Sequence, residues 1–274
     1  MIRIITDSSS NISQQEAREL GITVIPLTII FGDKQYRDGV DISTDEFYKK
    51  LTSTEDFPHT SQIGEDQLTK AYDECLKDGS EVLVLPISSG LSGSYSLAKT
   101  VAERPEYKNV TVYDTKCTTI MLKMLVQYAI AHKGESAANV CKGLDRLRKH
   151  IRLYACLNTL EYLKKGGRLG TAAATFGEIL KIKPVITVNE DGGLTVLGKA
   201  LGMHHGIKTI TDLFKKDKIE GDPVFIHTMD DKNAKTLAQK CGEKFKNIIS
   251  ENMCPVIGAH IGPAACGIVY IVKE

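Results

Sequence analysis

The sequence predicts an α/β protein made of two α/β domains, and three observations lead to this prediction. In the first half, short apolar runs alternate with helical patterns, which is typical of a mostly parallel sheet with helices on both faces. In the second half, two apolar runs are separated only by a glycine turn, which favours a mixed sheet. The chain has 274 residues, a length that suits two domains of about 100–200 residues each.

The elements expected in the first half follow from its periodicity. Strands are expected where apolar and β-branched residues form short runs, and helices where apolar residues recur every three or four positions. The expected strands are Ile2–Thr6, Ile22–Ile30, Glu81–Pro86 and Val110–Asp114. The expected helices are Ser13–Leu20, Thr44–Leu51, Glu65–Leu76, Ser92–Glu103 and Met121–His132.

The second half is expected to contain a hairpin, several further strands and two helices. Gly192 and Gly193 predict the hairpin turn, because glycine adopts the positive φ that tight turns need. The expected strands are Ile151–Leu157, Pro184–Val188, Leu194–Leu197, Val224–Thr228, Val256–Ala259 and Gly267–Val272, and the expected helices are Thr171–Leu180 and Ala234–Phe245. We place the domain boundary near residue 155, which gives domains 1–155 and 156–274.

Composition argues against several classes of partner and site. The 35 Lys and Arg residues and 34 Asp and Glu residues give a net charge of +1, and Trp is absent, so we expect no nucleic-acid partner. No two of the seven cysteines form C-x-x-C, so we expect neither a zinc site nor a thioredoxin-like site. The odd cysteine count and the lack of an export-signal pattern predict a cytoplasmic protein.

One uncharged stretch, residues 252–272, is long enough to span a bilayer. Pro255, Gly258, Gly262, Pro263 and Gly267 interrupt it. We therefore expect two short buried strands around a glycine loop and no transmembrane segment.

The loop from Ile87 to Tyr95 is the first candidate binding site. It follows an expected strand, and ligands of open α/β sheets bind beyond the carboxyl ends of the strands. Its glycines allow close backbone approach, and the next helix directs its N-terminal N–H groups toward a bound anion. Phosphate, sulfate or carboxylate would suit this loop, and helix capping is the alternative interpretation. It contains neither the Walker sequence nor G-x-S-x-G.

Four other polar loops are further candidates, each with a structural alternative. Thr6–Asn11 either binds an anion or caps the next helix, and the same holds for the hydroxyls of Thr60 and Ser61. Arg168, beside two glycines, either contacts a carboxylate or phosphate or joins the domains. His260, between glycines, either faces a cleft or is a structural residue.

Two other features are less specific. His204 and His205 are adjacent and would point to different faces of a helix, so we expect no metal site there. The small residues of Thr171–Leu180 indicate either close packing or room for a ligand.

The order of these loops resembles the DegV family of bacterial fatty-acid-binding proteins over essentially the whole chain. The matching segments are Thr6-Asp7-Ser8-Ser9-Ser10, Pro26-Leu27-Thr28-Ile29, Thr60-Ser61-Gln62, Ile87 to Tyr95, Gly166-Gly167-Arg168 and Gly258-Ala259-His260-Ile261-Gly262-Pro263. The chain departs from the family pattern at three positions, which are Ile63, Leu201 and Ala264.

The resemblance implies two α/β domains with one long-chain fatty acid between them. Its acyl chain would lie in an interior apolar tunnel and its carboxylate at the domain junction. Thr60 and Ser92 would hydrogen-bond the carboxylate, His260 would join this polar network, and Arg168 would lie near the entrance. Hydroxyls and N-terminal amides, including those of Ser61, Gly93 and Ser94, would offset the cost of burying the charge.

The resemblance also implies a non-catalytic protein with no cofactor, no catalytic residue and no metal. Members that serve a separate fatty-acid kinase present the carboxylate to it for phosphorylation, and they tend to carry an Arg where this chain has Leu201. Delivery to a kinase and use in other lipid metabolism are therefore both open.

Two enzymatic alternatives remain at this point. A serine hydrolase would use Ser92, His260 and an aspartate such as Asp114, in the chain order of α/β hydrolases. A small-molecule phosphate-binding enzyme would use the loop 88–94, with Asp38 and Asp41 as neighbouring carboxylates.

Overall fold

A parallel four-stranded sheet organises the first half of the chain. The computed structural model describes residues 1–169, 182–242, 245 and 249–273. The strands are β1 (Ile2–Asp7), β2 (Thr23–Ile25), β6 (Glu81–Leu85) and β7 (Val110–Val112), in the order β2-β1-β6-β7. Every pairing in this sheet is parallel, as the strand and helix alternation predicts.

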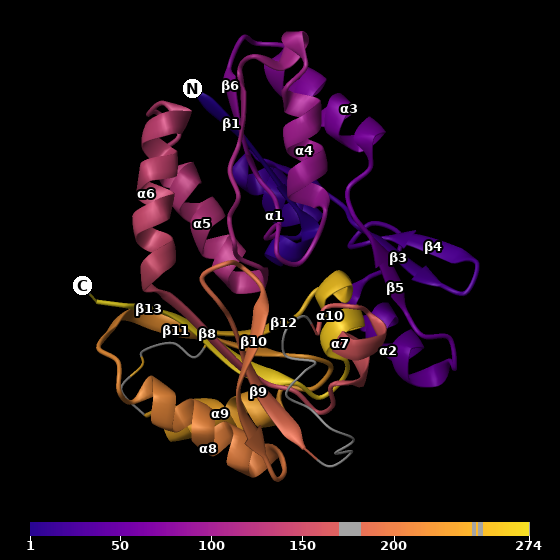
Figure 1. Cartoon of the computed structure of the whole chain (residues 1–274), viewed down its shortest axis with the longest axis vertical. Coiled ribbons are helices and arrows are strands. Elements are labelled where there is room, and N and C mark those ends of the chain that lie inside the picture. The colour runs from indigo at the N-terminus through magenta and orange to yellow at the C-terminus, as the bar shows by residue number, and fades with distance from the viewer. Residues whose placement is uncertain (170–181, 243–244, 246–248, 274) are drawn as a thin grey trace.

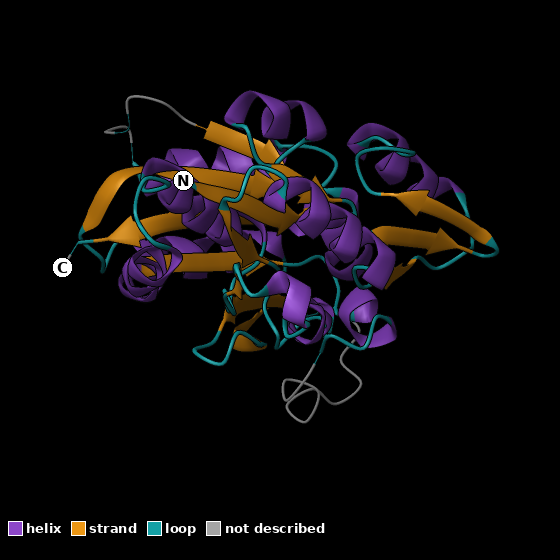
Figure 2. Ribbon diagram, turned by 90° about the horizontal axis from the view of Figure 1, so that it is seen from above, coloured by secondary structure: helices purple, strands orange, loops and turns teal. Residues whose placement is uncertain are grey.

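Helices cover both faces of this sheet (Figures 1 and 2). Ile4 and Leu83 pack into the cluster that contains helix α5, whereas Ile5 and Val84 pack into the cluster that contains helix α3. Neighbouring strand residues therefore serve opposite faces, because side chains alternate along a strand. The helices of this half are α1 (Gln14–Leu20), α2 (Thr44–Ser53), α3 (Glu65–Leu76), α4 (Ser94–Ala102), α5 (Thr119–Ala131) and α6 (Ala137–His150), with 3-10 turns at Ser8–Ser10 and Pro105–Tyr107.

A small antiparallel sheet lies beside the parallel one, and the sequence analysis did not anticipate it. The expected strand Ile22–Ile30 is divided at Pro26, which has no N–H to donate to a ladder. Its second part pairs with two later segments, so that Ile29 lies opposite both Tyr36 and Thr60. The strands are β3 (Thr28–Phe31), β4 (Lys34–Arg37) and β5 (His59–Ser61), in the order β4-β3-β5.

A mixed six-stranded sheet organises the second half, as expected. Its order is β10-β9-β8-β13-β11-β12, and only the pair of β11 and β12 is parallel. Along β8, Leu153 and Ala155 join the core that faces the first half, whereas Cys156 joins the core under α8 and α9. The strands are β8 (Ile151–Cys156), β9 (Lys183–Val188), β10 (Leu194–Ala200), β11 (Ile219–His227), β12 (Ile249–Asn252) and β13 (Cys266–Val272); the helices are α7 (Glu161–Lys165), α8 (Met203–Phe214), α9 (Lys232–Cys241) and α10 (Pro255–Ile261).

The structure corrects the expected pair of strands at 252–272. Val256–Ala259 belongs to the helix α10, not to a strand. Pro255 occupies the first turn, where its missing N–H costs nothing, and Gly262 ends the helix with φ +72°. Helices α6, α7 and α8 and strand β12 were not anticipated either. The expected helix Thr171–Leu180 lies outside the described residues, and the domain boundary near residue 155 stays a prediction.

Helix α10 lies against the first half of the chain through three polar contacts. Asn11 accepts a hydrogen bond from Cys254 N at 2.7 Å, and Tyr48 donates one to Met253 O at 2.9 Å. Asp38 accepts one from Val256 N, at 3.3 Å. The start of this helix is therefore fixed by residues that come more than 200 positions earlier in the chain.

We expect Asn11→Gly to lower the free energy of unfolding by about 1–2 kcal/mol, because the variant leaves Cys254 N without its acceptor. Glycine keeps the backbone, since Asn11 has φ +59°. Urea denaturation followed by circular dichroism measures the change. The matched control is Ala264→Gly, at another left-handed position (φ +61°). Equal losses in the two variants would contradict the assigned role of the Asn11 side chain.

Candidate functional site

A cavity lies between the six-stranded sheet and the first half of the chain. It encloses about 800 Å³ of space free of protein atoms, counting the part open to solvent. Fifteen of its 22 described lining residues are apolar. They are Leu27, Ile87, Leu91, Leu153, Ala155, Leu157, Leu163, Ile186, Val188, Leu194, Ile226, Met253, Val256, Ile257 and Ile261.

The apolar wall comes mainly from one face of the six-stranded sheet and from α10. Leu153, Ala155 and Leu157 line the cavity at every second position of β8 and just beyond it, as the alternation of a strand requires. The opposite wall comes from the loops that follow β6 and β7 in the first half. The cavity therefore lies at the carboxyl ends of the parallel strands, where α/β proteins bind ligands.

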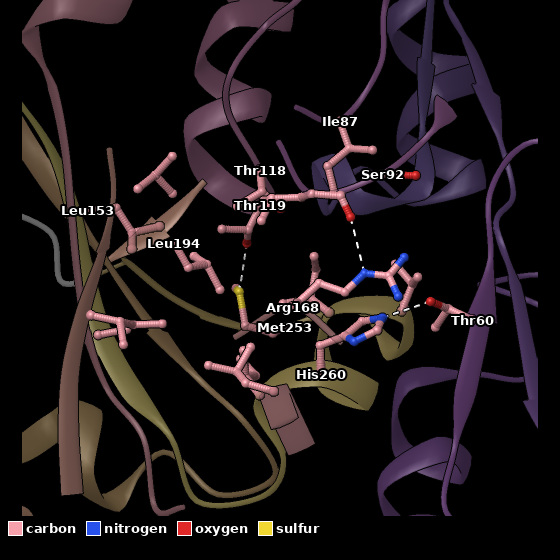
Figure 3. Close-up of a pocket in the computed structure, with 18 of the residues that line it drawn as sticks. Thr60, Ile87, Ser92, Thr118, Thr119, Leu153, Arg168, Leu194, Met253 and His260 are labelled. Carbon is pink, nitrogen blue, oxygen red and sulfur yellow. Dashed lines mark hydrogen bonds between the residues drawn. The ribbon is translucent and has the colours of Figure 1, made fainter. Parts of the chain in front are cut away.

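The polar lining residues are concentrated at one end of the cavity. Thr60 lies on β5, Ser92 precedes α4, Arg168 follows α7, and His260 is in α10 (Figure 3). Leu153 and Leu194 lie at the other side of the same view. Four segments that are distant in sequence thus meet at one polar end of a space whose other lining residues are apolar except for Thr118 and Thr119.

His260 is a neutral, hydrogen-bonded side chain of this polar end. Its Nε2 lies 2.7 Å from Thr60 Oγ1. Burial, together with the charges of Arg168 and His59, lowers the pKa of His260 from 6.5 to about 4. Its Nδ1 is buried and has no hydrogen-bond partner among the described residues. A Cβ at Gly166 would overlap with this nitrogen, so glycine makes room for the imidazole.

Arg168 is held by backbone carbonyls from both halves of the chain. Its Nη1 donates to Gly166 O at 2.7 Å and its Nε donates to Leu91 O at 3.1 Å. Within the described residues it has no carboxylate partner. These contacts orient the guanidinium at the cavity, where its positive charge suits an anionic ligand group.

The loop 88–94 is held in place largely by its own side chains. Ser92 Oγ accepts a hydrogen bond from Ser94 N at 3.2 Å and lies 3.0 Å from Ser94 Oγ. Ser94 is fully buried, and its hydroxyl accepts a hydrogen bond from Ile63 N. Ser88 donates to Gly192 O at the tip of the β9–β10 hairpin. This loop therefore connects the two halves in addition to lining the cavity with Ser92.

Five of the seven predicted ligand-binding residues line the cavity: Thr60, Ser61, Ser92, Arg168 and His260. Gly93 and Ser94 do not, because they form the start of α4 behind Ser92. The sequence analysis missed Thr118, Thr119 and Met253. The two threonines come after the strand β7. Because ligands of α/β sheets bind beyond the carboxyl ends of the strands, this position could have identified them as candidates.

The triad of the alternative serine hydrolase is not assembled. Ser92 pairs with Ser94, and His260 with Thr60. Asp114 accepts hydrogen bonds from Ser89 and from Lys116 N. No hydrogen bond among the described residues links Ser92, His260 and Asp114, so this alternative lacks the relay that it requires.

The phosphate-binding enzyme also lacks the arrangement that it requires. Asp38 is buried and accepts a hydrogen bond from Val256 N, whereas Asp41 pairs with Arg37 near the surface. The two carboxylates therefore do not form a shared magnesium site. In the described part of the chain, no three His, Cys, Asp or Glu side chains are grouped as metal ligands would be. No helix found there has the length and apolar character needed to cross a membrane.

We expect His260 to make stability depend on pH. Its pKa in the folded state, about 4, lies below the ordinary histidine value of 6.5, which applies to the unfolded state. Between pH 4 and pH 6.5 the unfolded state therefore binds more protons than the folded state. The free energy of unfolding of the wild type, relative to His260→Gln, should fall by up to about 3 kcal/mol as the pH drops from 7 to 4. Denaturant titrations of both proteins at a series of pH values measure this difference.

The comparison with the variant is needed because Asp38 acts in the opposite direction. Burial, together with the Asp7 charge, raises the pKa of Asp38 from 3.8 to about 7, so this group favours the folded state as the pH falls. It contributes equally to the wild type and to His260→Gln. The exposed His204→Gln serves as control and should follow the wild type. A pH-independent difference between wild type and His260→Gln would show that His260 is not the group described.

Comparisons with known proteins agree over the whole chain. Residues 1–273 match the family model described as uncharacterised proteins of the DegV family. A DegV domain-containing protein of Staphylococcus aureus is 33% identical over 278 residues, with 98% of each chain covered. A structure described as fatty acid binding of a DegV family protein from Thermus thermophilus is 30% identical, with TM-score 0.88 and 99% of each chain covered. A stearic-acid-binding protein from Eubacterium ventriosum is 25% identical, with TM-score 0.84, covering 100% of this chain and 99% of its own. The chain belongs to the DegV family.

Proposed function

We propose that this protein binds one long-chain fatty acid, with the acyl chain in the apolar cavity and the carboxylate at the polar end. The observation that carries the proposal is the separation of the lining into a mainly apolar part and one polar end. A fatty acid is divided in the same way, into an apolar acyl chain and a polar carboxylate. The Thermus thermophilus and Eubacterium ventriosum relatives, which are described as binding fatty acid and stearic acid, support it.

The acyl chain supplies the affinity. Burial contributes about 0.8 kcal/mol per methylene, so some fourteen methylenes contribute roughly 11 kcal/mol before the cost of association. That cost is about 4–15 kcal/mol, and the difference between the free energy of burial and this cost sets the dissociation constant. An apolar cavity that is already formed lowers the cost, because few side chains need to be ordered on binding.

The carboxylate sets the orientation, because a buried charge without partners is costly. Arg168 provides the opposite charge, and the hydroxyls of Thr60 and Ser92 provide donors. A neutral His260 that is protonated on Nε2 donates to Thr60 Oγ1, which leaves the Thr60 proton for the ligand. Ser61 remains a predicted contributor to this end, whereas Gly93 and Ser94 lie behind Ser92 and the amide of Ser94 already donates to Ser92 Oγ.

We propose that the protein acts as a carrier without chemistry of its own. The bound acid then goes either to a separate fatty-acid kinase or to other lipid metabolism. The two routes differ in their product, since only the first forms an acyl phosphate. Leu201 is 76% exposed and stands where kinase-serving relatives tend to carry an Arg, which favours the second route.

The purified protein should contain fatty acid at close to one molecule per chain. Organic extraction followed by mass spectrometry measures the amount and the chain length. A protein that is empty after purification and that also fails to bind added stearate or palmitate would refute the proposal. Extraction of an equal amount of an unrelated protein from the same cells provides the background.

Thr60→Val should weaken binding of a fatty acid by roughly 1.5–3 kcal/mol, because it removes a donor to a buried charge at nearly constant volume. Its effect on the methyl ester should be smaller, since the ester carries no charge. Thr60→Ser keeps the hydroxyl and is the matched control. Titration of each variant with acid and ester decides the matter: equal losses for both ligands would mean that Thr60 does not contact the carboxylate.

A further inference from the structure

Two hydroxyl side chains interrupt the apolar lining away from the polar end. Thr118 and Thr119, at the start of α5, both line the cavity. In the close-up they lie between Arg168 and Leu194, on the wall opposite His260 (Figure 3). An acyl chain that runs from the polar end toward Leu153 passes them.

Thr118 has an unused hydrogen-bonding group. The residue is 7% exposed, and its Oγ1 is buried without a hydrogen-bond partner among the described residues. Thr118 precedes α5 in the N-cap position, but its side chain does not cap the helix. Buried polar atoms are hydrogen-bonded in the great majority of cases, so an unpaired hydroxyl beside a ligand cavity points to a ligand atom.

Thr119 has only a weak partner and an unfavourable backbone. Its hydroxyl donates to Met253 Sδ at 2.7 Å, and a thioether sulfur is a weak acceptor. Its φ is +48°, a left-handed conformation that is rare for a β-branched residue. Lys116 in the same turn has φ +50°. Strain of this kind persists where the surrounding structure requires it, commonly at binding sites.

We propose that Thr118, with Thr119 beside it, recognises an oxygen atom carried part-way along the acyl chain. The ligand class is then an oxygenated fatty acid, with a hydroxyl or oxo group on the chain. This inference rests on the proposed function. A plain acyl chain leaves the Thr118 hydroxyl unpaired, whereas a chain hydroxyl pairs with it. Rotation about the Cα–Cβ bond exchanges the hydroxyl and the methyl of Thr118 without changing its volume.

The experiment compares stearate with hydroxystearates that carry the hydroxyl at successive carbons. The wild type should bind one positional isomer about 5–10-fold more tightly than the isomers on either side. In Thr118→Val, which keeps the shape and removes the hydroxyl, this preference should disappear. Stearate should bind Thr118→Val as tightly as the wild type or more tightly. Thr118→Ser keeps the hydroxyl and should keep the preference.

The controls separate this inference from the proposed function. A stearate with a methyl branch at the preferred carbon tests bulk alone and should bind no better than stearate. Equal binding of all hydroxy isomers by the wild type would overturn the inference, as would a Thr118→Val variant that keeps the preference. In both cases stearate binding would stand. Failure of the wild type to bind stearate at all would instead refute the proposed function.

Discussion

The site exists only because helix α10 of the second half lies against the first half. It brings His260 to Thr60, 200 positions away in sequence, and closes one wall of the cavity with Val256 and Ile257. A helix of seven residues has little stability of its own, so its position depends on contacts made by its neighbours. Those contacts come from buried or half-buried groups of the first half. The interface that joins the two halves therefore also assembles the polar end of the cavity.

This interface also determines the charges around the cavity. Burial raises the pKa of Asp38 and of Asp7 and lowers the pKa of His260, so the interior favours the neutral form of each. Arg168 supplies the positive charge of a guanidinium at this end. The polar end therefore combines one fixed positive charge with neutral hydrogen-bonding groups. Such a set favours a single carboxylate over a phosphate dianion, which would need more positive charge.

The sequence predicted the parallel sheet, the mixed sheet and residues of the polar end, but not the small antiparallel sheet or α10, and only the resemblance to the DegV family implied an interior tunnel. Strand and helix periodicity identified β1, β6 and their helices, and glycine-bearing loops identified Ser92, Arg168 and His260. The apolar residues after Pro255 are too few to separate a strand from a helix, although proline at a first turn was a helix signal. Leu153 and Ile186 could not be recognised as cavity residues, because a lining side chain and a core side chain have the same apolar character.

The mixed sheet explains why there is a cavity at all. Its outer face is filled by α8 and α9, whereas its inner face meets loops and short helices that cannot fill it completely. Unfilled apolar space destabilises a protein in proportion to its volume, so a ligand in this space replaces missing core. A ligand that binds only the folded chain stabilises it further by mass action. Under the proposed function the acyl chain would be both cargo and part of the hydrophobic core, beside the apolar clusters that already join the two halves.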